Sequence, residues 1–267
     1  MRELRMGAVG VIVPDVLTVL AGHYPQNRRL KMRNAIITMM VVLLPAAGAS
    51  AYPDKYFYSS GQILPGEHWN NVYIYNDDTV VDMLGGGADG IGTYDASTVN
   101  ILGGYVSTLS TLDLSTANVS GGYVYILGAM GQSTATFSGL AAGMSFGVED
   151  SATLNVTGGM VDAVGAMEQG TLNLRGGVVS DCLGARDLST VNIFGYNLAK
   201  APTGGTYGYG VVSGYWWDET PFTINLNGSE TYSRINLIPE PATLILLAIG
   251  ASALHRRSYK KIRTSHQ

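Results

Sequence analysis

Two consecutive stretches, STVNILGGYVSTL (97–109) and STANVSGGYVYIL (115–127), share the pattern that decides the fold. Each alternates apolar and polar residues for several positions, turns at glycine and then resumes in extended form, which is typical of β-strands. Turn glycines recur from Gly85 to Gly195 at intervals of 18 or 19 residues. A fixed internal period of this length indicates a stacked repeat architecture.

Each repeat suits one coil of a parallel β-solenoid. The unit is too short for a helix-turn-helix repeat, whereas solenoid coils stack about 4.8 Å apart with their strands in register. The pattern is compatible with either hand of coil. We therefore predict an all-β fold, a right- or left-handed parallel β-solenoid (β-helix) with coils of about 18 residues, capping strands and terminal hydrophobic helices.

The alternation assigns two inward columns and one outward column of side chains. The first inward column holds Val99, Ile101, Val119, Phe137, Leu154, Val156, Leu172, Leu174, Val191 and Ile193, and the second holds Val106, Val124, Ala142, Val161 and Val179. The outward column is an asparagine ladder of Asn100, Asn118, Asn155, Asn173 and Asn192, interrupted by Thr136. Stacked amides of this kind hydrogen-bond along the stack. One coil alone buries too little apolar surface to offset roughly 1–2 kcal/mol of ordering cost per residue, so neighbouring coils must complete the core.

The amino-terminal end has the layout of a secretory signal peptide. Basic residues at 28–33 precede an apolar run at 35–44, and the small residues Ala49 and Ala51 mark a cleavage site after Ala51. Met1 and Met32 are alternative translation starts. An amino-terminal signal of this kind predicts export by the Sec machinery.

The carboxyl-terminal end contains IPEPATLILLAIGASALHRRSYKKIR at 238–263. Pro239, Glu240 and Pro241 precede thirteen uncharged, mostly apolar residues, fewer than the roughly 20 that span a bilayer comfortably as a helix. Five cations follow, Arg256 and Arg257 among them, and such a cluster stays on the cytoplasmic side of a membrane. The run therefore predicts a marginal membrane segment.

The triplet, the short apolar segment and the paired arginines resemble the PEP-CTERM sorting signal of Gram-negative bacteria, which the membrane protease exosortase reads. The resemblance implies transient anchoring in the inner membrane, cleavage near Pro239–Glu240–Pro241 and transfer to the cell surface or extracellular matrix. The basic tail to Gln267 is longer than the family norm. An ordinary tail anchor with an accidental triplet is the alternative interpretation.

These patterns divide the chain into five segments. They are an amino-terminal extension and signal peptide at 1–51, an amino-terminal cap at 52–84, the solenoid repeats at 85–202, a carboxyl-terminal cap at 203–238 and the sorting signal at 239–267.

Between its two ends the chain is strongly acidic. Residues 52–238 contain 17 acidic and five basic residues, a net charge of −12, whereas the whole chain carries −4. Such a surface repels phosphate backbones, so we expect no nucleic-acid partner. Cys182 is the only cysteine, which excludes an intrachain disulfide and predicts a small buried thiol.

Three small motifs offer weak signals for ligand sites. Gly85, Gly87 and Gly90 match the spacing of a dinucleotide-binding loop, but the next residues enter another repeat instead of a helix. His68 is the only histidine of the segment 52–238, which excludes a multi-histidine metal cluster there, and beside Trp69 it is expected to belong to the cap.

Carboxylates near the same turns are the third signal. Asp82, Asp89 and Asp95 offer the oxygen ligands that calcium prefers, but the glycine-rich calcium repeat is absent. We expect solvated turn carboxylates, with no metal and no cofactor.

The strongest candidate for a ligand site is Tyr215, Trp216 and Trp217 with Asp218 and Glu219. Exposed aromatic rings stack on sugars, and glycoside hydrolysis needs two carboxylates about 5–10 Å apart across the bond. In a strand, neighbouring residues point to opposite faces. We therefore expect a hydrophobic cap without catalysis, and glycan binding by the three aromatic residues is the alternative.

Together these features predict an exported cell-surface or extracellular-matrix protein with a structural or adhesive role and no catalytic activity. Its expected partners are the Sec machinery, an exosortase-type protease, the membrane transiently, and an extracellular polysaccharide as a further candidate. The alternatives are a glycan-binding module and a carbohydrate-active enzyme on a β-helix scaffold. An enzyme of this kind needs carboxylates and cations gathered on one strand face, and five scattered cations argue against it.

Overall fold

The computed structural model describes residues 52–239, and they form a parallel β-solenoid of about eight coils, as the repeat predicts. The strands are β1 (Lys55–Phe57), β2 (Gly61–Ile63), β3 (His68–Ile74), β4 (Val80–Met83), β5 (Gly87–Thr93), β6 (Thr98–Ile101), β7 (Tyr105–Thr111), β8 (Thr116–Val119), β9 (Tyr123–Ala129), β10 (Thr134–Phe137), β11 (Ala142–Val148), β12 (Thr153–Ala166), β13 (Thr171–Ala185), β14 (Thr190–Ala201), β15 (Val211–Tyr215), β16 (Pro221–Asn227) and β17 (Ile235–Pro239). The one helix of the described residues is the single turn α2 (Thr231–Arg234).

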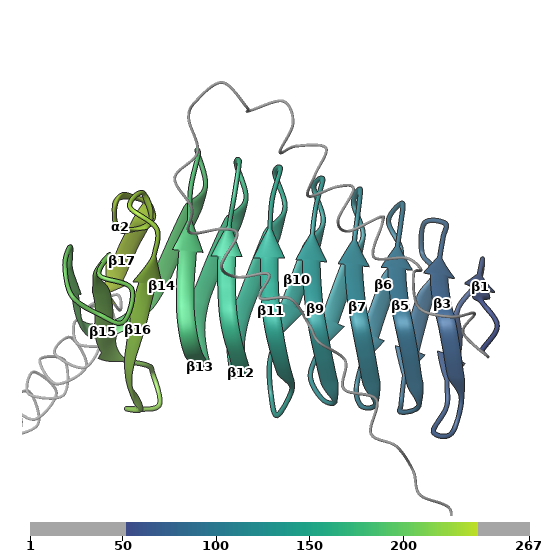
Figure 1. Ribbon diagram of the computed structural model, residues 1–267. Coiled ribbons are helices and arrows are strands. Elements are labelled where there is room, and N and C mark those ends of the chain that lie inside the picture. The colour runs from purple at the N-terminus through teal and green to yellow at the C-terminus, as the bar shows by residue number, and fades with distance from the viewer. Residues whose placement is uncertain (1–51, 240–267) are drawn as a thin grey trace, which may run out of the picture. The chain divides into compact units, whose positions relative to one another are not determined.

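Each coil contributes one strand to each of two parallel faces. Figure 1 shows the longer strands β3, β5, β7, β9 and β11 side by side on one face, and the short strands β4, β6, β8 and β10 run behind them. β12 and β13 continue from one face to the other without a break. Between the faces the backbone turns at residues with positive φ, such as Gly122 (75°) and Asp113 (55°), so glycine and aspartate recur there.

The core fills the space between the two faces. Every predicted member of the first inward column is buried, and so are Val106, Val124, Val161 and Val179 of the second. Ala142 was assigned to the wrong face, because Gly143 is the residue in register with Val124 and Val161. The ring of Phe146 occupies the space that a side chain at Gly143 would need, which explains why glycine holds this inward position.

The stack of coils begins at Lys55, ahead of the boundary at residue 85. β1 pairs with β3, β2 pairs with β4, and both continue in register into the repeats, so segment 52–84 contains paired coils of the solenoid. The ring of Phe57 lies over Gly61, and the ammonium group of Lys55 lies 5.3 Å from the centre of the Phe57 ring. This end of the stack is therefore closed by an aromatic ring and a cation above it.

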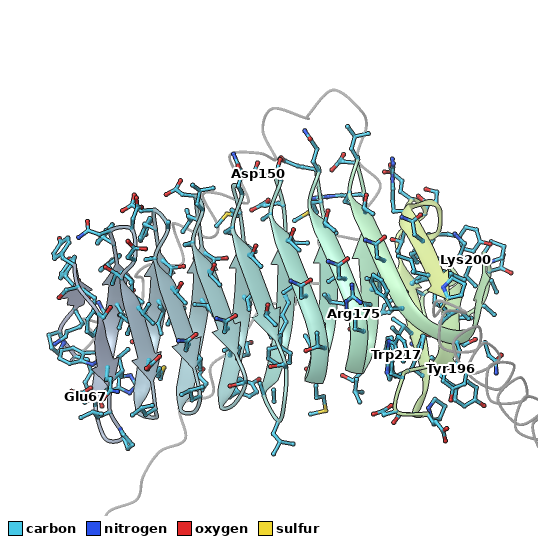
Figure 2. All side chains as sticks on the ribbon, turned by 180° about the vertical axis from the view of Figure 1, so that it is seen from behind. Glu67, Asp150, Arg175, Tyr196, Lys200 and Trp217 are labelled. Atoms are coloured by element: carbon cyan, nitrogen blue, oxygen red, sulfur yellow. The ribbon has the colours of Figure 1, made fainter. Side chains whose placement is uncertain are left out.

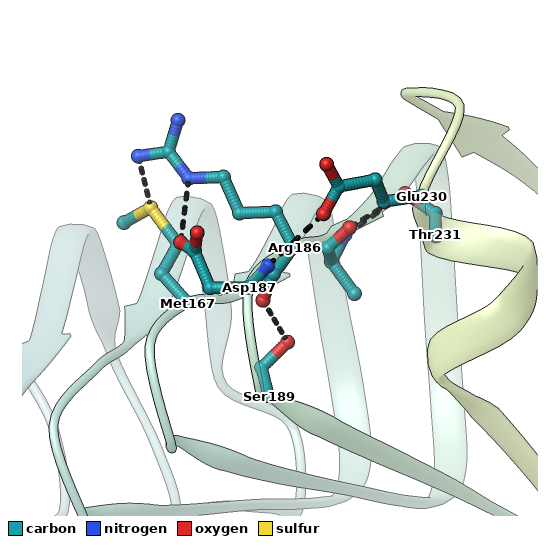
Figure 3. Close-up of polar contacts among 7 residues, drawn as sticks. Met167, Arg186, Asp187, Ser189, Glu230 and Thr231 are labelled. Carbon is teal, nitrogen blue, oxygen red and sulfur yellow. Dashed lines mark hydrogen bonds and ion pairs between the residues drawn. The ribbon is translucent and has the colours of Figure 1, made fainter. Parts of the chain in front are cut away.

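The carboxyl-terminal cap departs from the parallel pattern. β15 pairs antiparallel with both β14 and β16, while β16 runs parallel to β13 and β17 runs parallel to β14. Figure 3 shows one contact between the cap and the last coils, in which the backbone N–H of Asp187 donates to Glu230 (3.2 Å). In addition, the backbone N–H of Ala185 donates to the hydroxyl of Thr231 (2.9 Å). These contacts fix α2, and with it the start of β17.

Among residues 52–239, no helix is long and apolar enough to cross a membrane. The predicted terminal hydrophobic helices fall at 1–51 and 240–267, outside the described residues.

Candidate functional site

The predicted sorting signal begins inside the last strand of the solenoid. β17 pairs with β14 in an unbroken parallel register that ends with Pro239 opposite Gly195. Among residues 52–239, Pro239 is therefore the final paired residue. The other sorting residues, Glu240, Pro241, Arg256 and Arg257, and the cleavage residues Ala49 and Ala51 lie outside the described residues.

Two side chains hold β17 in place. Lys200 on β14 donates from Nζ to the carbonyls of Tyr232 (3.1 Å) and Ile235 (2.9 Å), and its ammonium group lies 4.6 Å from the centre of the Tyr232 ring. Asn236 donates to the side-chain oxygen of Asn192 (3.1 Å) and so extends the asparagine ladder into β17. The strand that leads into the sorting signal is thus fixed by a cation and by the ladder.

The aromatic candidate divides into one buried and two exposed residues. Trp216 is only 3% exposed, donates from Nε1 to the carbonyl of Gly177 (2.9 Å) and stacks on Phe222 with ring centres 3.8 Å apart. Trp216 therefore anchors the cap and is too buried to belong to the candidate glycan-binding site. Tyr215 is 39% exposed and Trp217 is 48% exposed.

The neighbouring carboxylates lie in a turn, and the strand geometry assumed for them is wrong. Trp216 N donates to Thr220 O (2.9 Å) and closes the turn, and Glu219 has a φ of 66°. Hydrogen bonds from the side chain and backbone N–H of Thr220 lower the pKa of Asp218, so this carboxylate stays ionised and is poorly suited to act as a general acid.

The glycine motif has a structural explanation. Gly87 and Gly90 lie in β5, and a side chain at either would collide with His68 or Asn71 of the preceding coil. His68 lies 3.5 Å from Asp89 across the same pair of strands. The motif leads along β5 into β6 and no helix begins there, so the phosphate-binding arrangement of a dinucleotide loop is absent at this motif.

The three candidate calcium ligands are separated by the fold. Asp82 lies in β4 and accepts a hydrogen bond from Asn100 (2.8 Å), Asp89 lies in β5, and Asp95 lies in a turn, where it accepts from the backbone N–H of Asn76 (3.0 Å). Only Asp95 is the turn carboxylate that was expected. Within residues 52–239, no group of three or more carboxylate, histidine or cysteine side chains is arranged to hold a metal ion.

The remaining reactive groups do not converge. Cys182 is 3% exposed, and burial raises the pKa of its thiol from 9.0 to about 11, so the nucleophilic thiolate is scarce at neutral pH. Arg175 stacks on the ring of Phe194 at 3.6 Å, whereas Arg186 contacts the sulfur of Met167 (2.7 Å) and Asp187 (3.7 Å). The two arginines thus have separate sets of partners.

Two regular features of the surface were missed by the sequence reasoning. One is a column of threonines in register beside the asparagine ladder, formed by Thr98, Thr116, Thr134, Thr153, Thr171 and Thr190. The recurring Thr at the start of each repeat is the signal that could have revealed it. The ladder itself forms as expected, with amide bonds of 2.9 Å from Asn118 to Asn100 and from Asn173 to Asn155.

The second missed feature is a tyrosine stack on the amino-terminal coils. Tyr58, Tyr75 and Tyr94 stack in sequence with ring centres 5.6 and 4.8 Å apart, and Tyr56 stacks on Tyr73 at 5.0 Å. Tyr56 and Tyr58 are 51% and 62% exposed. Tyr75 and Tyr94 are 19 residues apart, so the repeat interval places them in adjacent coils.

Comparison with known proteins gives one match. No curated protein and no solved structure matches the chain. The family model of the PEP-CTERM protein-sorting motif matches residues 237–261, which confirms the predicted sorting signal and includes the last three residues of β17. The chain thus carries, on a β-solenoid, the PEP-CTERM sorting motif of exosortase substrates.

Proposed function

We propose that this chain is a structural or adhesive component of the cell surface or extracellular matrix, delivered there after exosortase cleavage and without catalytic activity. The observation that carries the proposal is the direct junction between a regular β-solenoid and the sorting motif at 237–261. A stack of in-register coils supplies a stiff module with repeating surface groups, a property suited to a structural role.

The surface chemistry of the solenoid supports this role. The threonine column and the asparagine ladder give one face two parallel rows of uncharged hydrogen-bonding groups over several coils. Hydroxyl and amide groups in register can bind neutral, hydroxyl-rich polymers at many weak points at once. The net charge of −12 favours solubility and separation from other anionic surfaces.

Sorting should depend on residues 239–267. A chain that ends at Ile238 keeps β17 except for its last residue but loses the triplet, the apolar run and the basic tail. We expect it to appear freely in the periplasm or medium, whereas the full chain fractionates with the membrane before cleavage. Cell fractionation and mass spectrometry of the mature protein measure both points, and identical fractionation of the two forms would show that the sorting interpretation is wrong.

The structural role is tested by attachment and by the absence of turnover. Cells that lack the chain should attach less well or release more matrix than cells that produce it. The purified mature protein should generate neither reducing ends nor unsaturated products from neutral and acidic polysaccharides, with or without calcium. Product formation that disappears with Asp218→Ala or Arg175→Ala would instead establish a carbohydrate-active enzyme.

Glycan binding is a second candidate function, favoured by the tyrosine stack. Within the stack the rings cover one another's faces, so a sugar polymer would meet a row of ring edges and hydroxyl groups and could stack on the exposed end ring, Tyr58. The pKa values of Tyr73, Tyr75 and Tyr94 are raised, mainly by burial, so these phenols stay neutral at physiological pH. Binding that disappears with Tyr58→Ser but persists with Trp217→Ser would assign the glycan to this stack.

A further inference from the structure

The described part of the solenoid ends near a stacked pair of tyrosines, of which Tyr215 is exposed. Pro239, where the described part of β17 ends, lies opposite Gly195. Gly195 contacts the backbone of Tyr215, and the rings of Tyr196 and Tyr215 stack with centres 5.3 Å apart. The exit of the sorting segment and Tyr215 therefore both adjoin β14, at the consecutive residues Gly195 and Tyr196.

The distance from this exit to the apolar run is short. Only Glu240 and Pro241 separate Pro239 from Ala242, where the run begins. Three residue steps extend to roughly 10 Å at most. While the sorting motif anchors the chain, the cap end of the solenoid is thus held against the membrane surface.

The aromatic residues at this end have the chemistry of a membrane interface. Tryptophan and tyrosine accumulate at the level of the lipid headgroups, because each ring combines an apolar body with a polar group. Trp217 is 48% exposed and Tyr215 is 39% exposed, and the buried Trp216 between them fixes their position. Figure 2 shows Tyr196 and Trp217 at the cap end of the stack and Glu67 at the opposite end.

The distribution of charge favours an orientation in which the cap end of the solenoid faces the membrane. Residues 52–174 carry twelve acidic residues and one cation, Lys55, a net charge of −11. Residues 175–238 carry five acidic residues and four cations, a net charge of −1. An anionic membrane surface repels the first part far more strongly than the second.

We propose that Tyr215 and Trp217 form a membrane-contact surface that rests in the interfacial layer of the bilayer while the sorting motif tethers the chain. The solenoid then stands with its cap on the membrane and its acidic coils directed away. Asp218 and Glu219 in the adjacent turn keep this contact shallow, since carboxylates remain in water. A weak contact is sufficient, because a short tether gives an effective concentration on the order of millimolar.

The test uses residues 52–267, the chain after signal-peptide removal with its sorting motif intact, reconstituted in phosphatidylcholine vesicles with and without brominated acyl chains that quench nearby tryptophan. The chain has three tryptophans: Trp69 in β3 near the opposite end of the stack, the buried Trp216, and Trp217. We expect brominated lipid to quench the tryptophan emission of Trp217, which is the same part of the emission that is lost in Trp217→Phe. The emission remaining in Trp217→Phe should be insensitive to bromine.

A reporter on the side of the stack is the matched control. Tyr105 in β7 is 43% exposed, comparable to Trp217, and Tyr105→Trp in the Trp217→Phe background places a tryptophan far from the cap. The tryptophan at position 105 should not be quenched.

The proposal is overturned if Trp217 escapes quenching. It is also overturned if the Tyr105→Trp reporter is quenched equally, because the solenoid would then lie flat on the membrane. A response of Trp217 to neutral polysaccharide and not to lipid would assign the surface to a glycan. The attachment experiment that tests the structural role has a separate readout, so its result does not depend on any of these outcomes.

Discussion

Val161→Asp is expected to unfold several coils and to lower the free energy of unfolding by at least about 3 kcal/mol. Val161 is fully buried, in register with Gly143 on one side and Val179 on the other. A carboxylate there has no partner and no access to water. Because each coil is stabilised by its neighbours, the loss spreads beyond the substituted coil. Denaturant unfolding followed by circular dichroism measures the effect.

Two variants in the same coil serve as controls. Met160→Asp introduces the same carboxylate one residue earlier, where the side chain is 51% exposed, and should change the stability by less than about 1 kcal/mol. Asn155→Ala removes one ladder bond, the 2.9 Å contact from Asn173, and should cost about 1 kcal/mol. Equal losses for Val161→Asp and Met160→Asp would contradict the assignment of inward and outward faces.

The sequence was sufficient to predict the solenoid because one repeat fixes both the strands and their register. A period of 18 or 19 residues brings equivalent positions together in adjacent coils, so apolar alternation becomes buried columns and recurring asparagines become a ladder. The extent of the stack was harder to predict. Val81 and Met83 continue the inward column of Val99 and Ile101 at the same interval, but Asp82 replaces the asparagine between them. Between Ile63 and Met83 the interval lengthens to 20 residues, so the earlier coil does not fit the period of 18 or 19 residues.

The candidate site was only partly predictable, because tertiary contacts decide which aromatic residue is exposed. Trp216 and Trp217 are neighbours in sequence and have the same local propensities. Trp216 is buried because Gly177, thirty-nine residues away, accepts its indole N–H and Phe222 stacks on its ring. Likewise, Ala142 and Gly143 exchange roles because the Phe146 ring folds back into the core. Neither contact has a signal in the local sequence pattern.

Gly122→Ala should destabilise the solenoid by at least about 2 kcal/mol, through backbone strain and overpacking together. Gly122 has a φ of 75°, which disfavours any side chain, and a Cβ atom there would lie 2.5 Å from the carbonyl oxygen of Gly104 in the preceding coil. Because the carbonyl of Gly104 accepts a hydrogen bond from the backbone N–H of Tyr123, it cannot move away without breaking the backbone pairing between the two coils.

Gly147→Ala is the matched control: no atom lies within 4 Å of a Cβ at this position, so the substitution should leave stability within about 0.5 kcal/mol. Thermal unfolding of the two variants compares them directly, and a loss in Gly147→Ala as large as that in Gly122→Ala would show that these glycines are needed for something other than the close stacking of turns.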